Sequence, residues 1–173
     1  MRIITGSARG TRLETPEGLD TRPTAERVKE ALFSMIQFEI DGKRVLDLFG
    51  GSGQLGLEAL SRGAWKATFV DASKEAVETI KTNAKKTKLF DRCVILNTDY
   101  KAFIRGAAGK ERFDIIFLDP PYAKEQIVAD IEKMAERALF SEDVMVVCET
   151  DKAVELPEEI ACLGIWKEKI YGI

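Results

Sequence analysis

From residue 44 onward the sequence alternates short apolar segments with segments of helical periodicity. The apolar segments are 44–49, 67–71, 93–99, 113–119 and 144–150, and the helical patterns fall near 54–62, 73–88, 100–106 and 124–138. Continuous apolar strands separated by helices predict βαβ units, in which helices cover both faces of a mostly parallel sheet. We therefore expect an α/β, Rossmann-like fold whose ligands bind beyond the carboxyl ends of the strands.

The first 43 residues precede this alternation. RIITGSARGTRLETP, within residues 1–20, predicts a small β-hairpin with its turn at SARG. Residues 21–36 predict an amphipathic helix, because Val28, Leu32 and Ile36 recur at helical spacing and Thr24 is placed as the N-cap. A chain of 173 residues suffices for one buried core, so we expect a single domain with its functional part in 44–150.

Four of the predicted strands end on or near an acidic residue. These residues are Asp47, Asp71, Asp99 and Asp119. The carboxyl ends of parallel strands share one edge of the sheet, so we expect the four carboxylates at a common rim. Gathered carboxylates repel one another unless a ligand or hydrogen-bond donors lie between them. Any one of these acids alone is also explained as an ordinary solvated strand end.

The composition narrows the possible chemistry. The sequence contains 0 histidines, which excludes Ser-His and Cys-His pairs, imidazole acid–base chemistry and His-ligated metals. Cys93, Cys148 and Cys162 are odd in number and widely separated, which favours reduced thiols, and we expect no metal site. No apolar run approaches the ~20 residues of a membrane helix, and the N-terminus lacks a signal-peptide core. We therefore expect a cytoplasmic protein without a membrane partner.

Charge is unevenly distributed along the chain. The net charge is −3, yet residues 61–110 carry 11 Lys and Arg against 5 Asp and Glu, whereas residues 111–173 carry 7 against 15. Arg2, Arg9 and Arg12 lie in a stretch without acids and could contact phosphates. The basic run at 81–88 is equally explained as a solvated helix face, so charge permits a nucleic-acid partner without requiring one.

The first predicted strand leads into a glycine-rich loop, 47-DLFGGSGQLGLEAL-60. Gly51, Gly53 and Gly56 fit the pattern G-x-G-x-x-G, and Asp71 lies 18 residues after Gly53, so a dinucleotide site has to be considered. Asp47 argues against it, because a carboxylate beside the loop would repel a pyrophosphate. A carboxylate at this place suits a cofactor with an ammonium and a sulfonium and without phosphate, such as S-adenosylmethionine.

The segment DLFGGSG also resembles the D/E-x-x-x-G-x-G loop of class I methyltransferases. The resemblance implies S-adenosyl-L-methionine as the cofactor, with the loop backbone close to its methionine part. It further implies that Asp71 binds the ribose hydroxyls and that Asp99 and Tyr100 hold the adenine. The implied cofactor-binding residues are Asp47, Phe49, Gly51, Gly53, Asp71, Asp99 and Tyr100.

The fourth predicted strand ends abruptly in Asp119-Pro120-Pro121-Tyr122, where two prolines cannot continue a ladder. This motif resembles the Asp-Pro-Pro-Tyr of methyltransferases that act on planar amino nitrogens, which implies that these four residues are catalytic. Asp119 and the Pro120 carbonyl would accept the two amino hydrogens while Tyr122 stacks on the base. The alternative is a strand-ending turn whose tyrosine covers the core.

Three blocks together resemble the RsmD-type 16S rRNA guanine-N2 methyltransferases over nearly the whole chain: RIITGSARGTRLETPEGLDTRPTAERVKEALFSMI, RVLDLFGGSGQLGLEALSRGA and LDPPYA. The resemblance implies methylation of one guanine N2 in 16S rRNA, within an assembling small ribosomal subunit. It also implies that Arg22, Thr24 and Arg27 help to hold RNA or to close over the cofactor; a structural cap and an exposed charge are the alternatives. We expect a monomer.

Other functions stay open at this point. The same amino-group motif serves methylation of DNA or of a protein glutamine. An NAD(P)-binding oxidoreductase would use Gly51, Gly53 and Gly56. A non-catalytic RNA-binding module is a further alternative.

The sequence ends at IWKEKIYGI (165–173), whereas class I methyltransferases carry a further strand that lies antiparallel beside the fifth. We therefore expect the fifth strand to have an uncovered edge. Such an edge affects stability and aggregation more than mechanism.

Overall fold

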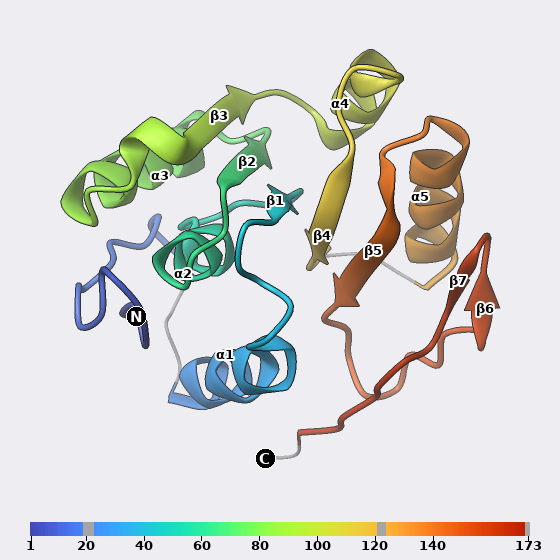
Figure 1. Cartoon of the computed structure of the whole chain (residues 1–173), viewed down its shortest axis with the longest axis horizontal. Helices are drawn as coiled ribbons and strands as arrows, with labels where there is room; N and C mark the ends of the chain where they lie inside the picture. Colours follow the sequence, from blue (N-terminus) through green and yellow to red (C-terminus); the bar gives the residue numbers. More distant parts are fainter. Residues whose placement is uncertain (19–22, 121–123, 172–173) are drawn as a thin grey trace.

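The computed structural model describes residues 1–18, 23–120 and 124–171 (Figure 1). Its α-helices are α1 (Pro23–Ile36), α2 (Gln54–Ser61), α3 (Lys74–Lys86), α4 (Tyr100–Ala107) and α5 (Lys124–Glu136). Its strands are β1 (Arg44–Asp47), β2 (Lys66–Asp71), β3 (Cys93–Asn97), β4 (Phe113–Leu118), β5 (Phe140–Cys148), β6 (Glu159–Ile160) and β7 (Leu163–Gly164). Strands and helices alternate from β1 to β5, which confirms the predicted α/β organisation.

Strands β1 to β5 form one parallel sheet in the order β3-β2-β1-β4-β5. The chain runs from β1 through β2 to β3 and then returns to place β4 on the other side of β1 (Figure 1). The strand order therefore reverses between β1 and β4, which is where open α/β sheets bind their ligands. Asp47 is in register with Phe117, so the carboxyl ends of these two strands lie at nearly the same level.

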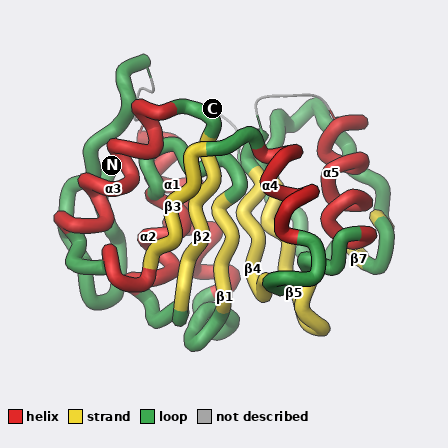
Figure 2. The backbone as a smooth tube through the Cα atoms, turned by 90° about the horizontal axis from the view of Figure 1, so that it is seen from above, coloured by secondary structure: helices red, strands yellow, loops and turns green. Residues whose placement is uncertain are grey.

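Successive residues of each strand point to opposite faces of the sheet. Val45 and Phe117 belong to a core shared with α1, α2, α3 and the N-terminal segment. Leu46 and Leu118 belong to a second core, which α4 and α5 complete. Helices thus cover both faces of the sheet, and Figure 2 shows α4 and α5 beside β4 and β5. This layering leaves the carboxyl ends of the strands as a rim.

The N-terminal segment is less regular than the predicted hairpin. A single antiparallel bridge joins Arg2 to Arg12. Backbone hydrogen bonds from the Ile3 N–H to the Thr11 carbonyl at 3.0 Å and from the Leu13 N–H to the Met1 carbonyl at 2.9 Å also join the two arms of the predicted hairpin. The buried side chains of Ile3, Ala8 and Leu13 pack the segment on the core.

The predicted N-cap of the first helix is wrong. Helix α1 begins at Pro23. Proline suits the first helical position, because a backbone N–H there would have no acceptor within the helix. Thr24 therefore lies inside the helix, and Arg22 lies outside the described residues.

The C-terminal part holds two differences from the prediction. Strand β5 starts at Phe140, ahead of the predicted 144, because a register shift between Phe113 and Ile115 adds an early pairing with β4. Strands β6 and β7 form an antiparallel pair that was not predicted, since two residues per strand show no periodicity. Within the described ranges β5 is an edge of the sheet, as expected. In the same ranges no helix has the length and apolar character needed to cross a bilayer.

Candidate active site

The glycine loop joins β1 to α2 at the point where the strand order reverses. Gly51 and Gly53 have φ angles of 57° and 79°, a left-handed conformation that favours glycine. The Gly53 N–H donates to the Gly50 carbonyl at 2.7 Å and closes the turn that starts α2. A Cβ on Gly56 would lie 2.3 Å from the Phe69 ring. Gly56 therefore allows close helix–strand packing, whereas Gly51 and Gly53 shape the loop.

Asp71 ends β2 and holds two backbone segments. Its Oδ2 accepts a hydrogen bond from the Gly51 N–H at 2.9 Å, and its Oδ1 accepts one from the Ser73 N–H at 2.8 Å. Each carboxylate oxygen has two lone pairs, so each can accept one more hydrogen bond. Asp71 can thus fix the glycine loop and still bind a hydroxyl.

Asp47 lies beneath the loop and is only 3% exposed. Its Oδ2 accepts the Gly56 N–H at 3.1 Å. Burial raises the pKa of the Asp47 carboxyl well above its ordinary value, and the charges of Asp119 and Asp71 add to this shift, while the Gly56 hydrogen bond opposes it. Three of the four predicted rim acids are therefore electrostatically coupled.

Asp99 and Tyr100 start helix α4. Asp99 Oδ1 accepts the backbone N–H groups of Lys101 and Ala102 at 2.9 and 3.3 Å, so Asp99 is the N-cap of this helix. The Tyr100 ring packs against Phe49 of the glycine loop, with centroids 5.0 Å apart. This aromatic pair links the loop to α4 and gives the site an apolar wall.

Asp119 and Pro120 follow β4 directly, whereas Pro121 and Tyr122 lie outside the described residues. Asp119 is exposed as a whole residue. The surrounding protein still desolvates its carboxyl and raises the pKa above the ordinary value. Asp119 is therefore an acceptor open to a substrate at the end of β4.

Glu149, which follows β5, is a site residue that the sequence did not predict. Its N–H donates to the Leu118 carbonyl at 3.1 Å and extends the pairing of β4 with β5 by one residue. Glu149 is exposed as a whole residue, but the surrounding protein desolvates its carboxyl and raises the pKa, and the charge of Asp119 raises it further. The sequence pattern that could have identified Glu149 is the one that identified the other acids, namely an acidic residue at the end of an apolar strand.

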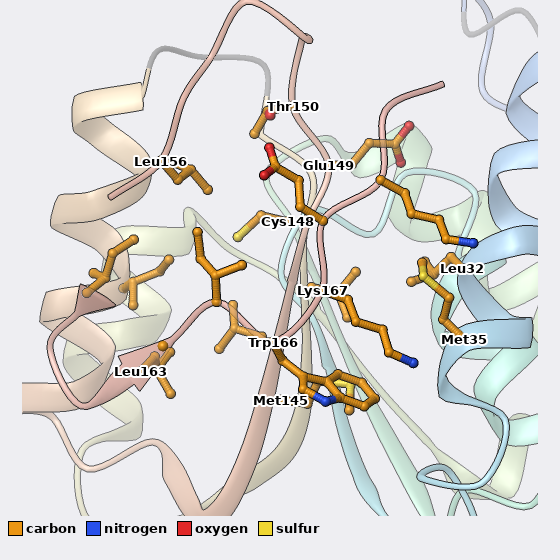
Figure 3. Close-up of a pocket in the computed structure, with 18 of the residues that line it drawn as sticks. Leu32, Met35, Met145, Cys148, Glu149, Thr150, Leu156, Leu163, Trp166 and Lys167 are labelled. Atoms are coloured by element: carbon orange, nitrogen blue, oxygen red, sulfur yellow. The ribbon is translucent and has the colours of Figure 1, made fainter. Parts of the chain in front are cut away.

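A cleft of about 520 Å³ opens beside β5, between α1 and the C-terminal segment. Figure 3 shows Leu32 and Met35 of α1 across the cleft from Met145 of β5 and Trp166. Glu149 also lines this cleft. The apolar cleft therefore borders the acidic rim.

The predicted RNA-facing residues are described only in part. Arg22 and the side chain of Thr24 are outside the description, and Arg27 is exposed on α1. Arg2 forms an exposed ion pair with Glu26, with Nε and Oε1 3.2 Å apart. The predicted contacts of Arg22, Thr24 and Arg27 with RNA therefore stay predictions.

The sequence also missed the residue that attaches the N-terminal segment. Glu58 of α2 has an exposed fraction of 0% and accepts the N–H groups of Ile4 and Thr5 at 2.9 and 3.0 Å. Its carboxylate pairs with Lys29 of α1 and with Arg62, each at 3.0 Å. Burial lowers the pKa of the Lys29 ammonium, and the neighbouring Glu58 raises it in part. Glu58 thus joins α1, α2 and the N-terminal segment.

Asn83 of α3 makes a second such connection. Its side chain exchanges two hydrogen bonds of 2.8 Å with the backbone of Glu14 and donates to the Ser52 carbonyl at 2.9 Å. The segment that precedes α1 is therefore attached to the glycine loop through one buried amide.

A parallel sheet with this strand order, a glycine loop after β1 and acids at the strand ends define a Rossmann-like class I methyltransferase. Solved S-adenosylmethionine-dependent methyltransferases share the fold. The structure of the Escherichia coli protein YhhF, which is 30% identical, matches with a TM-score of 0.85 over 99% of this chain and 92% of that one.

The chain belongs to the family described as Conserved hypothetical protein 95, which matches residues 1–173. YlbH of Bacillus subtilis is 41% identical over 174 residues, which cover 100% of this chain and 95% of that protein. A Haemophilus influenzae protein named Ribosomal RNA small subunit methyltransferase D is 35% identical over 176 residues, with coverage of 100% and 90%.

Proposed function

We propose that this chain transfers a methyl group from S-adenosyl-L-methionine to the exocyclic N2 amine of a guanine in 16S rRNA. The observation that carries this proposal is the open Asp119 carboxylate, followed by Pro120, at the end of β4 beside the glycine loop. Two fixed acceptors hold both hydrogens of a planar amino group and aim its nitrogen. The name of the Haemophilus influenzae relative supports small-subunit rRNA as the substrate.

The residues around the glycine loop fit the proposed cofactor. When bound, S-adenosylmethionine supplies an electrophilic methyl group on a sulfonium. A Cβ on Gly51 would meet nothing nearer than the Phe49 carbonyl at 4.0 Å, so the backbone there is open to a ligand. Asp71 and the buried Asp47 place two acidic side chains beside this loop, which suits an ammonium and a sulfonium better than a pyrophosphate.

The Asp119 carboxylate acts on the amine. It accepts one amino hydrogen, and its raised pKa makes it a better acceptor for the proton that the amine loses. We assign the second amino hydrogen to the Pro120 carbonyl and the stacking contact to Tyr122.

The proposed partner is an assembling small ribosomal subunit, and the proposed compartment is the cytoplasm, where the chain would act as a monomer. Arg9 and Arg12 are exposed on the N-terminal segment, which suits contacts with phosphates. A base within a helix must leave its stack before its amine reaches the end of β4.

Methyl transfer to isolated small subunits that lack native N2-guanine methylation tests the proposal. We expect labelled methyl in one guanine of 16S rRNA, mapped by mass spectrometry. Asp119→Ala should reduce transfer by about 100-fold or more, because the amine loses its orientation. The same variant should bind S-adenosylhomocysteine as the unchanged protein does, and the exposed Asp143→Ala variant is the control for transfer.

Other outcomes point to other functions. Labelled methyl in DNA or in a protein glutamine would show that this molecule, and not rRNA, is the substrate. Thermal stabilisation by NAD and not by S-adenosylhomocysteine would indicate an oxidoreductase. Cofactor binding without transfer to any of these substrates would indicate an RNA-binding module, and unchanged turnover in Asp119→Ala would reject the catalytic role.

A further inference from the structure

We propose that Glu149 identifies the target base as guanine by accepting a hydrogen bond from its ring N1–H while Asp119 holds the adjacent N2 amine. This inference rests on the proposed function and adds the residue that selects the base.

The backbone places the two carboxylates side by side. Leu118 of β4 is in register with Cys148 of β5, and the Glu149 N–H donates to the Leu118 carbonyl at 3.1 Å. Neighbouring strands lie about 4.8 Å apart. The residues that follow this pair, Asp119 and Glu149, are therefore neighbours at the rim.

Strand alternation directs both side chains to the same face. Phe117 and Val147 pack in the core that α1 shares, whereas Leu118 and Cys148 pack on the opposite face. One residue further, Asp119 and Glu149 return to the face of α1. The raised pKa of Glu149, to which the Asp119 charge contributes, agrees with this proximity.

Glu149 also differs from three of the other rim acids in its hydrogen bonds. Asp47, Asp71 and Asp99 each accept backbone N–H groups. Among the residues that the structure describes, the Glu149 carboxylate has neither a hydrogen-bond donor nor a cation as a partner. Two adjacent carboxylates repel each other unless donors lie between them.

Guanine presents the donors that such a pair needs. Its N1–H lies next to the N2 amine, so two neighbouring carboxylates face a continuous row of donors. Adenine and cytosine carry an acceptor ring nitrogen beside their amine, which the Glu149 carboxylate would repel. Glu149 therefore discriminates through the ring nitrogen, while Asp119 acts on the amine in every case.

Replacement of the mapped guanine by 2-aminopurine tests the inference. This base keeps the N2 amine, but its N1 is an acceptor without a hydrogen. Small subunits are reconstituted on unmodified 16S rRNA that carries either base at that position, introduced by splinted ligation. The unchanged chain should prefer guanine by about 10- to 100-fold in kcat/KM, as expected for one base-edge contact.

Two variants should change this preference. Glu149→Gln offers an amide that can donate to N1 of 2-aminopurine, so the ratio of guanine to 2-aminopurine should fall by about tenfold or more. Glu149→Ala removes both the acceptor and the repulsion and should lower the ratio as well. Glu142→Gln, an exposed position on the same strand, should keep the original ratio.

The outcomes separate this inference from the proposed function. Absence of guanine methylation by the unchanged chain would reject both. Guanine methylation with an unaltered ratio in both Glu149 variants would reject only the inference. An equal decrease of kcat/KM for guanine and for 2-aminopurine in the Glu149 variants would show that Glu149 supports the site without discriminating between bases. This result would overturn the inference too.

Discussion

The Asp71 carboxylate accepts a hydrogen bond from the Gly51 N–H at 2.9 Å, which connects the end of β2 to the loop that follows β1. The other carboxylate oxygen holds the Ser73 N–H at the start of α3. One side chain thus fixes the glycine loop and the entry to a helix, and it keeps lone pairs for a ligand. Shape and ligand affinity of the loop therefore depend on the same residue.

Replacement of Asp71 by alanine removes this acceptor from two backbone donors and from the ribose that we propose it binds. A hydrogen bond to a charged group contributes about 1.5–3 kcal/mol. We expect the Kd for S-adenosylhomocysteine to rise about 10- to 100-fold in isothermal titration calorimetry. Asp91→Ala changes an exposed acid and should bind as the unchanged protein does. Unchanged affinity in Asp71→Ala would assign the ribose to another residue.

Asp47→Asn should stabilise the fold and weaken cofactor binding. The buried carboxyl has a pKa well above its ordinary value, so above the pKa of the unfolded chain this group costs stability that an amide avoids. One pKa unit corresponds to about 1.4 kcal/mol, and we expect Tm to rise by a few degrees, at about 2–4 °C per kcal/mol. The variant should bind S-adenosylhomocysteine less tightly, because the loop loses the carboxyl that we propose favours the cofactor's ammonium.

The sign of this effect sets its pH dependence. A carboxyl with a raised folded pKa leaves the fold most stable below its unfolded pKa of about 3.9. The fold then loses stability as the pH rises from this value to the folded pKa, and the loss is constant above it. The advantage of Asp47→Asn should therefore be constant at high pH and shrink as pH falls between these two values. Thermal melts from pH 8 to pH 4 measure it, and a gain that grows on acidification would contradict the assignment.

Much of the sheet could be predicted because its strands are buried on both faces. Phe113–Leu118 is apolar except at Asp114, and its end at Asp119 follows from the two prolines. The start of β5 could not be predicted, since Glu142 and Asp143 are exposed and interrupt the apolar pattern. β5 instead depends on its pairing with β4, which is a tertiary contact.

The site shows the same division. The carboxylates at the ends of β1, β2 and β4 could be predicted because strand ends of a parallel sheet share one rim. The roles of Glu58 and Asn83 could not be predicted, since each binds backbone groups that are distant in sequence, more than fifty residues away for Glu58 and more than thirty for Asn83. Neither residue belongs to a motif, and only the folded chain shows what they connect.

Gly56→Ala tests whether the third glycine serves packing. The added Cβ would lie 2.3 Å from the buried Phe69 ring, so α2 or the ring has to move. Overpacking of this kind costs about 1–3 kcal/mol, which denaturant unfolding can measure. Gly106→Ala, where a Cβ would meet nothing within 4 Å, is the matched helical control and should not destabilise the fold. Equal stability of both variants would show that Gly56 is not a packing contact.

The Glu58 network gives the last prediction. Glu58→Ala leaves the N–H groups of Ile4 and Thr5 without their acceptor. It also leaves the buried Lys29 ammonium without its carboxylate, although the hydrogen bond of that ammonium to the Arg2 carbonyl at 2.8 Å stays. Removal of one partner of a buried ion pair costs about 3–5 kcal/mol, so we expect a loss of this size in denaturant unfolding. Transfer to small subunits should also weaken, because the arginine-bearing N-terminal segment loses one of its attachments to the core.

A double-mutant cycle separates the ion pair from the backbone contacts. Addition of Lys29→Met to Glu58→Ala removes the unpaired charge, so the double variant should be more stable than Glu58→Ala by about 1 kcal/mol or more. The two backbone donors stay unpaired, and full recovery is therefore not expected. Glu78→Ala removes an exposed pair with Lys81 and should leave the unfolding midpoint unchanged. If Lys29→Met does not restore stability, the cost lies in the backbone contacts or in Arg62, which also loses its partner, and not in the Lys29 charge.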